Sequence, residues 1–354
     1  MKIGICTTGG DCSGLNAAIY AAYKHAKAVK GVDVVGIQGS LSSLLSDQSS
    51  LMKLDQKLLE WHYLSGGTLL GTSSKGNPFR TKKDGKFDEI LVSRFHENLK
   101  KHDLDAVILI GGEGSHSIAA TLCETGAPIV GIPKTIDNDV PCSDNAIGFE
   151  TAADVVSQSI ERIRSTADSH NRIFALEVMG RNSGFLTLHG GLAARADALL
   201  LPEFRIDLPK LCTHIEKTFS RGAKSFVMAV AEGAYLKGEK PVFQKSESTK
   251  KRLGGIAAKL EMELQGKFQA DVRSNVLGHM QRGGKPSRKD LELALSLGSA
   301  AMASCLEGKK EVFIGTCNGS FKTVPYAHYP KSKQKKVDES YPLFQIAKQL
   351  NIFI

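Results

Sequence analysis

Short apolar runs alternate with longer stretches of helical periodicity along almost the whole chain. Apolar runs rich in β-branched residues predict buried strands at 2–7, 33–38, 105–110, 128–132, 172–179, 198–201, 225–231, 271–276 and 312–315. Apolar residues at helical spacing predict helices at 15–26, 54–61, 87–102, 119–124, 151–165, 189–194, 208–219, 249–264, 290–305 and 341–350. Strands that alternate with helices are typical of an α/β protein with mainly parallel sheets.

These elements fall into two blocks, and each block has its own polar loops at the ends of its strands. We therefore expect two doubly wound, mainly parallel-sheet domains with a cleft between them. In this prediction the first domain comprises residues 1–148 and about 282–330, and the second comprises 149–281 and about 331–354. Open α/β sheets bind ligands beyond the carboxyl ends of their strands, so the chemistry is expected in the loops there.

The stretch at 105–139 carries the densest candidate chemistry. Its first strand ends in Gly111-Gly-Glu-Gly-Ser115, a turn that lets the backbone approach a ligand and feeds the N-terminus of a helix, where anions bind. Its second strand ends in Pro133-Lys-Thr-Ile-Asp-Asn-Asp139. The two ends bring together one lysine, one hydroxyl and three carboxylates, which are Lys134, Thr135, Glu113, Asp137 and Asp139. Phosphoryl transfer to a hydroxyl requires such a set.

Two more glycine-rich loops belong to the first block. The loop at 8–14 also feeds a helix and suits phosphate, but it fits neither the GxGxxG nor the Walker A pattern. The loop at 65–78 contains Lys75, and its composition is as typical of a surface loop as of a ligand site.

The loops of the second block are rich in arginine. Arg172, Arg181, Arg273 and Arg282 lie in or beside strand ends, together with Glu232 and His279. Arginine recognises phosphate through a fixed bidentate fork, although a single arginine is more often a salt-bridge partner. Their number in one block favours a phosphorylated ligand.

Composition narrows the class of protein. The chain has 354 residues, 42% of them hydrophobic and 23% charged, which is ordinary for a soluble protein of two domains. No apolar run is long enough for a membrane helix, and a strand begins at once instead of a signal peptide. Seven scattered cysteines show neither CxxC metal spacing nor a disulfide framework. We expect a cytoplasmic protein without a membrane partner.

A net charge of +9 suits polyanionic ligands such as sugar phosphates and nucleotides, and by charge alone also nucleic acid. The basic residues are dispersed, however, and the one dense cluster at 331–336 lies in a polar loop. No nucleic-acid-binding motif is recognisable, so we expect no nucleic-acid partner.

Taken together, the loops resemble those of the 6-phosphofructokinase family. The resemblance rests on Gly9-Gly-Asp11 with Gly14 and Asn16, Gly111-Gly-Glu-Gly-Ser115, Pro133-Lys-Thr-Ile-Asp-Asn-Asp139, Met179-Gly-Arg181, Glu232 and Leu277-Gly-His-Met-Gln-Arg-Gly-Gly284, in the family's order. It implies transfer of a phosphoryl group to the 1-hydroxyl of fructose 6-phosphate with Mg²⁺, a step of glycolysis. The first domain would then bind the donor and the metal, and the second domain the sugar phosphate.

The resemblance also implies roles for single residues. Asp137 would be the base that deprotonates the hydroxyl, Arg181 would stabilise the developing charge, and Thr135 would contact the sugar or the transferred phosphoryl. Glu113 and Asp139 would hold Mg²⁺. The donor would contact Gly10, Lys75, Gly112, Gly114, Ser115 and Lys134. The sugar phosphate would contact Met179, Gly180, Glu232, His279 and Arg282, besides Thr135, Asp137 and Arg181. Arg172 and Arg273 would reach a neighbouring subunit's site in a homo-oligomer, usually a tetramer, with a dimer as the alternative.

The phosphoryl donor in this family is ATP or pyrophosphate. Gly114 resembles the ATP users, because pyrophosphate users typically carry an aspartate there that would repel an α-phosphate. Lys134 is found in pyrophosphate users and in a subgroup of ATP users, which Glu113 also resembles. We therefore expect ATP, with pyrophosphate as the alternative. Lys75 stands where many ATP users have an arginine, and the effector-site arginines of the bacterial allosteric enzymes are only partly matched.

Two other classes of function stay open at this point. A kinase with a similar glycine turn could act on a dinucleotide or a lipid. The arginine-rich second block argues against this reading, because it favours a phosphorylated acceptor. A catalytically silent nucleotide sensor or nucleic-acid binder would have no need for Asp137.

Overall fold

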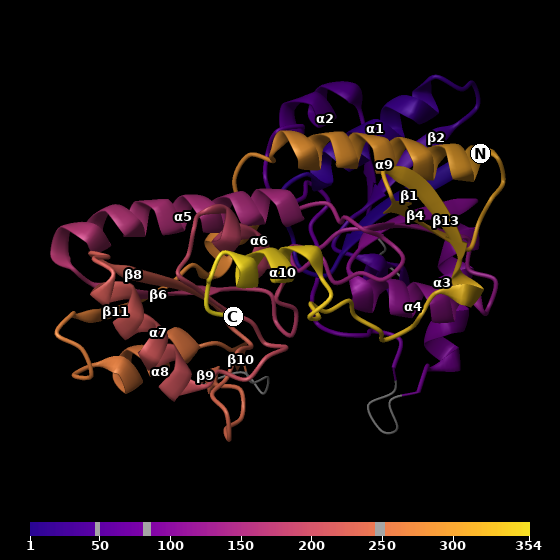
Figure 1. Ribbon diagram of the computed structural model, residues 1–354. Helices are drawn as coiled ribbons and strands as arrows, with labels where there is room; N and C mark the ends of the chain where they lie inside the picture. The colour runs from indigo at the N-terminus through magenta and orange to yellow at the C-terminus, as the bar shows by residue number, and fades with distance from the viewer. Residues whose placement is uncertain (47–49, 81–85, 245–251) are drawn as a thin grey trace. The chain divides into compact units, whose positions relative to one another are not determined.

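Figure 1 shows the computed structural model, which describes residues 1–46, 50–80, 86–244 and 252–354. The chain forms two compact units. Unit 1 comprises Met1–Thr135, Asp139–Thr151 and Arg282–Gln334, and unit 2 comprises Ile136–Asn138, Ala152–Gln281 and Lys335–Ile354. Each unit is an α/β structure with its own sheet, so the predicted fold class with mainly parallel sheets is confirmed.

Unit 1 contains a seven-stranded sheet in the order β13-β12-β5-β4-β1-β2-β3. The strands are β1 (Lys2–Thr8), β2 (Asp33–Ile37), β3 (Leu51–Lys53), β4 (Ala106–Gly111), β5 (Ile129–Pro133), β12 (Val312–Cys317) and β13 (Ser320–Pro325). The central pairs are parallel, and only the two edge strands β3 and β13 pair antiparallel to their neighbours. Because the sheet is covered on both faces, β4 and β5 are buried along their whole length.

Helices cover both faces of this sheet (Figure 1). The pair α1 (Leu15–Lys27) and α9 (Arg288–Leu306) packs on one face. On the other face α3 (Glu89–Lys101) and α4 (Glu113–Cys123) enclose a core with the short helices η1 (Leu41–Leu45) and η3 (Tyr326–His328). Helix α2 (Gln56–His62) packs beside α1. At the centre of this core lie Phe79, Phe95, Phe313, Tyr326 and Tyr329.

Unit 2 contains a four-stranded parallel sheet in the order β11-β6-β8-β7. Its strands are β6 (Ile173–Val178), β7 (Ala198–Leu200), β8 (Phe226–Ala231) and β11 (Val272–Val276), with a small hairpin of β9 (Phe243–Gln244) and β10 (Arg252–Leu253). The helices are α6 (Phe185–Ala193), α7 (Leu208–Ser220), α8 (Ile256–Leu264) and α10 (Pro342–Gln349), with the short η2 (Gly278–Arg282) after β11. Helix α5 (Phe149–His170) begins in unit 1 and continues through unit 2.

Several predicted boundaries need correction. Helix α4 begins at Glu113 instead of 119, because Gly112 adopts an extended conformation and caps the helix. Helix α8 begins at Ile256 instead of 249, since Gly254 and Gly255 have left-handed φ angles of 132° and 98°. Residues 249–251 of that predicted helix lie outside the described residues. Helix α6 begins at Phe185 instead of 189.

In the part of the chain that the structure describes, no helix has both the length and the apolar character that a membrane span needs.

Candidate functional site

The loop after β1 is held by a buried lysine. Lys134 follows β5, is only 2% exposed, and donates from Nζ to the carbonyl oxygens of Thr8 (2.8 Å) and Gly10 (2.5 Å). Gly9 in this loop has a φ of 90°, a conformation that side chains rarely adopt. The ammonium group therefore fixes the carbonyls of the loop, while the Gly9 N–H donates to the carbonyl oxygen of Ser73 (3.0 Å), which ties this loop to the loop at 65–78.

Arg282 packs against the same loop within unit 1. Its Nη1 donates to the carbonyl oxygen of Asp11 (3.0 Å), and a Cβ added at Gly10 would lie 2.6 Å from that nitrogen. Glycine at position 10 therefore admits the guanidinium group. The structure thus places Arg282 beside the predicted donor loop, and its predicted contact with the sugar phosphate stays a prediction.

The N-terminus of α4 lies next to this loop. Gly112 caps the helix, Glu113, Gly114 and Ser115 form its first turn, and Ser115 Oγ donates to the carbonyl oxygen of Thr8 (3.3 Å). The first N–H groups of a helix have no partner within the helix and carry partial positive charge. The binding of phosphate groups at these two strand ends of unit 1 stays a prediction.

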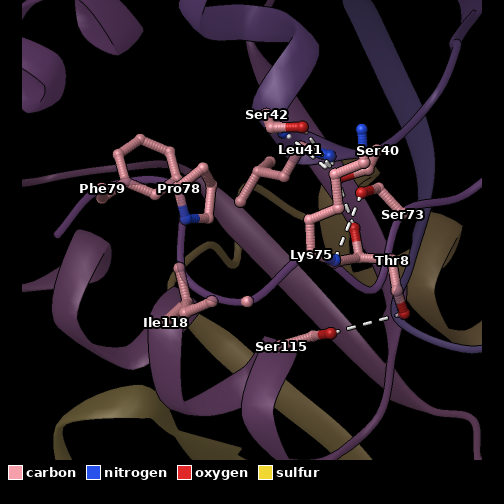
Figure 2. Close-up of a pocket in the computed structure, with 11 residues that line it drawn as sticks. Thr8, Ser40, Leu41, Ser42, Ser73, Lys75, Pro78, Phe79, Ser115 and Ile118 are labelled. Atoms are coloured by element: carbon pink, nitrogen blue, oxygen red, sulfur yellow. Dashed lines mark hydrogen bonds between the residues drawn. The ribbon is translucent and has the colours of Figure 1, made fainter. Parts of the chain in front are cut away.

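A cavity of about 220 Å³ opens beside these loops (Figure 2). Figure 2 shows Phe79, Pro78 and Leu41 near one another, while Thr8, Ser73 and Ser115 line a different part of the wall and Lys75 lies between them. The complete lining is Thr8, Ser40, Leu41, Ser42, Ser73, Lys75, Gly76, Pro78, Phe79, Ser115 and Ile118. The cavity is smaller than the roughly 300–1,000 Å³ of whole-ligand pockets, so it suits one part of a larger ligand. An apolar wall next to hydroxyls and a phosphate-binding loop fits the base or ribose of a nucleotide.

The two predicted metal ligands, Glu113 and Asp139, both belong to unit 1. Burial raises the pKa of Tyr329, and the negative charges of Glu113 and Asp139 act in the same direction. Glu113 Oε1 also accepts a hydrogen bond from Ser117 Oγ (2.6 Å). Mg²⁺ prefers oxygen ligands and usually takes one or two carboxylates together with substrate phosphates. The pair fits such an ion, and no group of three or more His, Cys, Asp or Glu side chains suited to a metal occurs among the described residues.

Asp137 belongs to unit 2. Its side chain is buried, and its carbonyl oxygen accepts a hydrogen bond from Ser183 Oγ (3.2 Å). The next residue, Asn138, has a left-handed φ of 50°, so the chain turns sharply there. Burial raises the pKa of Glu232, and the charge of Asp137 acts in the same direction.

Arg181 is held in a strained conformation beside Glu232. Its φ is 53°, that of Gly180 is 137°, and its backbone N–H donates to Glu232 Oε1 (3.0 Å). A Cβ at Gly233 would lie only 1.9 Å from the Arg181 carbonyl oxygen, so this turn needs glycine on the facing strand end. Left-handed non-glycine residues cost free energy and often mark functional sites. Met179 N–H donates to Oε1 of Gln281 (3.2 Å), a buried residue of the motif at 277–284 to which the sequence analysis assigns no role.

Arg172 and Arg273 lie at the edge formed by β6 and β11, where they share one carboxylate. Asp271 Oδ2 is 3.8 Å from Arg172 Nε and 2.6 Å from Arg273 Nη2. Both arginines keep partial exposure, so they stay accessible to a ligand or another chain. Sequence analysis missed Asp271, although its place two residues before Arg273 puts both side chains on the same side of the strand. His279 lies exposed in η2.

His116 supports the phosphate-binding end of the sheet and was also missed. Its Nε2 contacts the carbonyl oxygens of Gly111 (2.9 Å) and Ile132 (3.1 Å), and its Nδ1 pairs with the Tyr326 hydroxyl (2.8 Å). The ring therefore ties the ends of β4 and β5 together. Burial lowers the pKa of His116 to about 3 from 6.5, so the imidazole is neutral at pH 7.

This lowered pKa predicts acid sensitivity. Since the unfolded chain binds a proton near pH 6.5 that the folded chain excludes, the free energy of unfolding should fall as the pH drops from about 6.5 towards 3, by up to about 1.4 kcal/mol per pH unit. Urea unfolding at several pH values should show a shallower dependence for His116→Asn than for the wild type. Parallel curves would contradict a buried neutral imidazole.

Each unit therefore collects one part of the predicted site. Unit 1 contains Gly10, Lys75, Gly112, Glu113, Gly114, Ser115, Lys134, Thr135, Asp139 and Arg282. Unit 2 contains Asp137, Arg172, Met179, Gly180, Arg181, Glu232, Arg273 and His279. The meeting of these groups across a cleft stays a prediction, as do the individual roles.

Comparison with known sequences identifies the family. A sequence model described as phosphofructokinase matches residues 2–305. The chain is 38% identical to pyrophosphate–fructose 6-phosphate 1-phosphotransferase of Dictyoglomus thermophilum, covering 96% of each chain. It is 36% identical to ATP-dependent 6-phosphofructokinase 1 of a Nostoc species, over 100% of this chain and 98% of the relative. It is also 36% identical to ATP-dependent 6-phosphofructokinase 3 of Streptomyces coelicolor, over 94% and 99%.

Solved structures give the same result for the fold. The phosphofructokinase of Saccharomyces cerevisiae matches with a TM-score of 0.76 and 27% identity, over 93% of this chain and 45% of that longer chain. The pyrophosphate-dependent phosphofructokinase of Nitrosospira multiformis matches with a TM-score of 0.81 over 96% of this chain and 86% of that chain. At 19% identity this second match supports the fold alone.

Proposed function

This chain belongs to the phosphofructokinase family, and we propose that it phosphorylates fructose 6-phosphate at the 1-hydroxyl, with ATP as the donor, to give fructose 1,6-bisphosphate. Relatives of nearly equal length, aligned over almost the whole chain, are named ATP-dependent 6-phosphofructokinases. This reaction is a committed step of glycolysis, and we assign the protein to the cytoplasm.

The observation that carries the choice of ATP is the cavity next to the phosphate-binding loops. Pyrophosphate consists of phosphate groups alone, and a phosphate-binding loop is sufficient for it. The apolar wall of Leu41, Pro78, Phe79 and Ile118 offers burial for a base or a ribose edge, which only a nucleotide possesses.

In the proposed reaction, unit 1 binds the phosphoryl donor and the metal ion. The backbone of the loop at Gly10 and the N-terminus of α4 bind the donor's phosphates, with Gly112, Ser115, Lys75 and Lys134 beside them. Glu113 and Asp139 would hold Mg²⁺, which when bound would neutralise charge on those phosphates. These residues thereby orient the terminal phosphoryl group and exclude water from it.

The acceptor is bound and activated mainly by residues of unit 2, with Thr135 and Arg282 contributed by unit 1. Asp137 takes the proton of the 1-hydroxyl, and Arg181 stabilises the charge that develops on the transferred group, with Thr135 contacting that group. Met179, Gly180, Glu232 and His279 bind the sugar phosphate, together with Arg282. The Arg181 N–H held by Glu232 links sugar recognition to placement of the catalytic arginine.

Arg172 and Arg273 read the phosphate of a substrate bound to a neighbouring subunit in a homo-oligomer, of which a tetramer is the expected form. Two exposed guanidinium groups gathered by one carboxylate at a sheet edge support this role. Sedimentation velocity would test the assembly, and a monomer with full activity would contradict it.

Pyrophosphate as donor is the second candidate. A relative at 38% identity is named for pyrophosphate, and Lys134 is also found in such enzymes. Coupled assays at saturating fructose 6-phosphate should show turnover with ATP far above that with pyrophosphate. Activity with pyrophosphate and none with ATP would overturn our choice.

Gly114 gives a sharper test of the donor. A Cβ at this position meets no atom within 4 Å, so Gly114→Asp should fold normally, and an acidic residue in the first turn of α4 even favours the helix dipole. Its charge should repel the donor's phosphates and raise the KM for ATP at least about tenfold. The neutral control Gly114→Ala should stay near the wild type. Equal KM values for ATP in both variants would contradict the prediction.

A further inference from the structure

The turn that carries Arg181 is fastened at its last residue to another loop of unit 2. Residues 180–184 connect β6 to α6, and Gly184 is the N-cap of that helix. The Gly184 N–H donates to Oε1 of Glu203 (2.9 Å). Glu203 lies beyond the end of β7, 19 positions further along the chain, so this hydrogen bond joins two strand-end loops.

The same turn holds both residues to which the proposed reaction assigns the proton transfer and the developing charge. Ser183 Oγ donates to the carbonyl oxygen of Asp137 (3.2 Å), so the turn is bonded to the backbone of Asp137. Arg181 lies within the turn at a left-handed φ of 53°. A non-glycine residue keeps such a conformation only where its surroundings enforce it, so the position of Arg181 depends on how the turn is anchored.

The carboxylate of Glu203 is packed directly against the turn. Its Oε2 is buried and has no hydrogen-bond partner among the residues that the structure describes. A Cβ added at Gly184 would lie 2.6 Å from this oxygen, so glycine at position 184 gives the carboxylate room to approach. A buried oxygen without a partner costs stability, and the hydrogen bonds to Oε1 are therefore what holds this side chain in place.

The second hydrogen bond of Oε1 comes from the segment Lys335–Ile354 of unit 2. The N–H of Val337, a residue 2% exposed, donates to Glu203 Oε1 (3.0 Å). This segment also contacts α6, since the Tyr341 hydroxyl pairs with His189 Nε2 (2.9 Å). One carboxylate oxygen thus ties the turn at the start of α6 to a segment that packs on the same helix.

We propose that Glu203 is a positioning residue for the proposed phosphoryl transfer. Its carboxylate fixes the turn at 180–184, and the turn fixes Arg181 and the carbonyl group of Asp137. The inference rests on the roles proposed for those two residues and adds the residue that holds both. Glu203 acts through the backbone and touches neither substrate.

The first measurement follows the turn itself, by hydrogen–deuterium exchange of the full-length protein without substrates. In Glu203→Ala the Gly184 N–H loses its acceptor, so peptides that cover 180–185 should exchange at least about tenfold faster than in the wild type. Peptides from β6 should exchange as in the wild type, because this strand is paired on both sides.

The second measurement is steady-state kinetics with ATP and fructose 6-phosphate. Glu203→Ala should lower kcat about 100-fold, on the scale that small misplacement of catalytic groups costs, while the KM for ATP stays within about twofold. Burial raises the pKa of Glu203, so a neutral amide is a close substitute for this side chain. Glu203→Gln keeps an acceptor for both N–H groups and should restore most of the kcat and the slow exchange.

Two further variants separate positioning from stability. Tyr341→Phe removes a hydrogen bond between the segment Lys335–Ile354 and α6 but none that Glu203 makes, so it should lower the unfolding midpoint and leave kcat near the wild type. Glu203→Asp withdraws the carboxylate by one methylene group and should lower kcat at least about tenfold. It provides the test if the alanine variant does not fold.

Fast exchange at 180–185 together with a low kcat in the alanine or aspartate variant, both restored by glutamine, supports the proposal. Unchanged exchange or unchanged kcat in those variants would overturn it. An equal loss of kcat in Tyr341→Phe would overturn it too, because that result reports general loosening of unit 2. If the wild type does not phosphorylate fructose 6-phosphate, the proposed function fails, whereas the exchange data still decide whether Glu203 holds the turn.

Discussion

Replacing Asp137 by serine is expected to lower turnover by about 10⁴-fold while the affinity for fructose 6-phosphate stays nearly unchanged. The 1-hydroxyl is a poor nucleophile until its proton is taken, and serine has no group that accepts a proton at neutral pH. The side chain of Asp137 is buried, and the carbonyl oxygen of Asp137 accepts a hydrogen bond from Ser183 Oγ, so the shorter serine should leave the loop in place.

Two measurements separate the base from a packing effect. Turnover is followed in a coupled assay with ATP, and binding of fructose 6-phosphate is followed by calorimetry without donor. Asp137→Asn keeps the shape of the side chain and should be about as inactive as the serine variant. Turnover close to the wild type in either variant would refute the assignment of Asp137 as the base.

The parallel strands were predictable because a strand that is buried on both faces consists largely of apolar residues. Every residue of β4, β5, β6 and β8 is buried, so these strands read as apolar runs. The one charged residue among them is Glu177 of β6, whose carboxylate accepts from the N–H groups of Gly255 and Ala257. The edge strand β13 has five exposed residues of six and carries no such pattern. Its existence depends on antiparallel pairing with β12, a contact that no local signal reports.

The start of α4 shows a second limit of local signals. Glycines at 112 and 114 have low helix propensity and predict a loop. The helix begins at Glu113 nevertheless, because His116 one turn later is anchored to the ends of β4 and β5. Tertiary hydrogen bonds therefore override propensity where the site requires a helix N-terminus.

The residues of the candidate site also differ in how far local sequence signals reveal them. Residues that lie in strand-end loops, such as Gly10, Asp137 and Arg181, were identified from the sequence because their motifs are local. Residues that act from a distance were not, since Asp271 and His116 lie within no motif. The Tyr326 hydroxyl pairs with His116 Nδ1 from 210 positions further along the chain, and only the fold reveals that contact.

Replacement of Lys134 by methionine is expected to lower kcat/KM for ATP by about 100-fold, on the scale that small misplacement of a binding loop costs. Methionine fills nearly the same volume but donates no hydrogen bond. The carbonyl oxygens of Thr8 and Gly10 would lose their common donor, and each lost bond to a charged group costs about 1.5–3 kcal/mol. The unfolding midpoint should therefore fall as well.

The control is Lys289→Met, which removes an exposed lysine of the same unit that lies 3.4 Å from Glu150. Such surface pairs contribute about 0–1 kcal/mol, so this variant should match the wild type in activity and stability. The affinity of Lys134→Met for fructose 6-phosphate, measured by calorimetry, should also match, because the residues proposed to bind the sugar phosphate lie mostly in the other unit. Lys134→Met could instead retain full activity with ATP and lose activity only with pyrophosphate. In that case Lys134 contacts the transferred phosphate, and its hydrogen bonds to the loop do not position the donor.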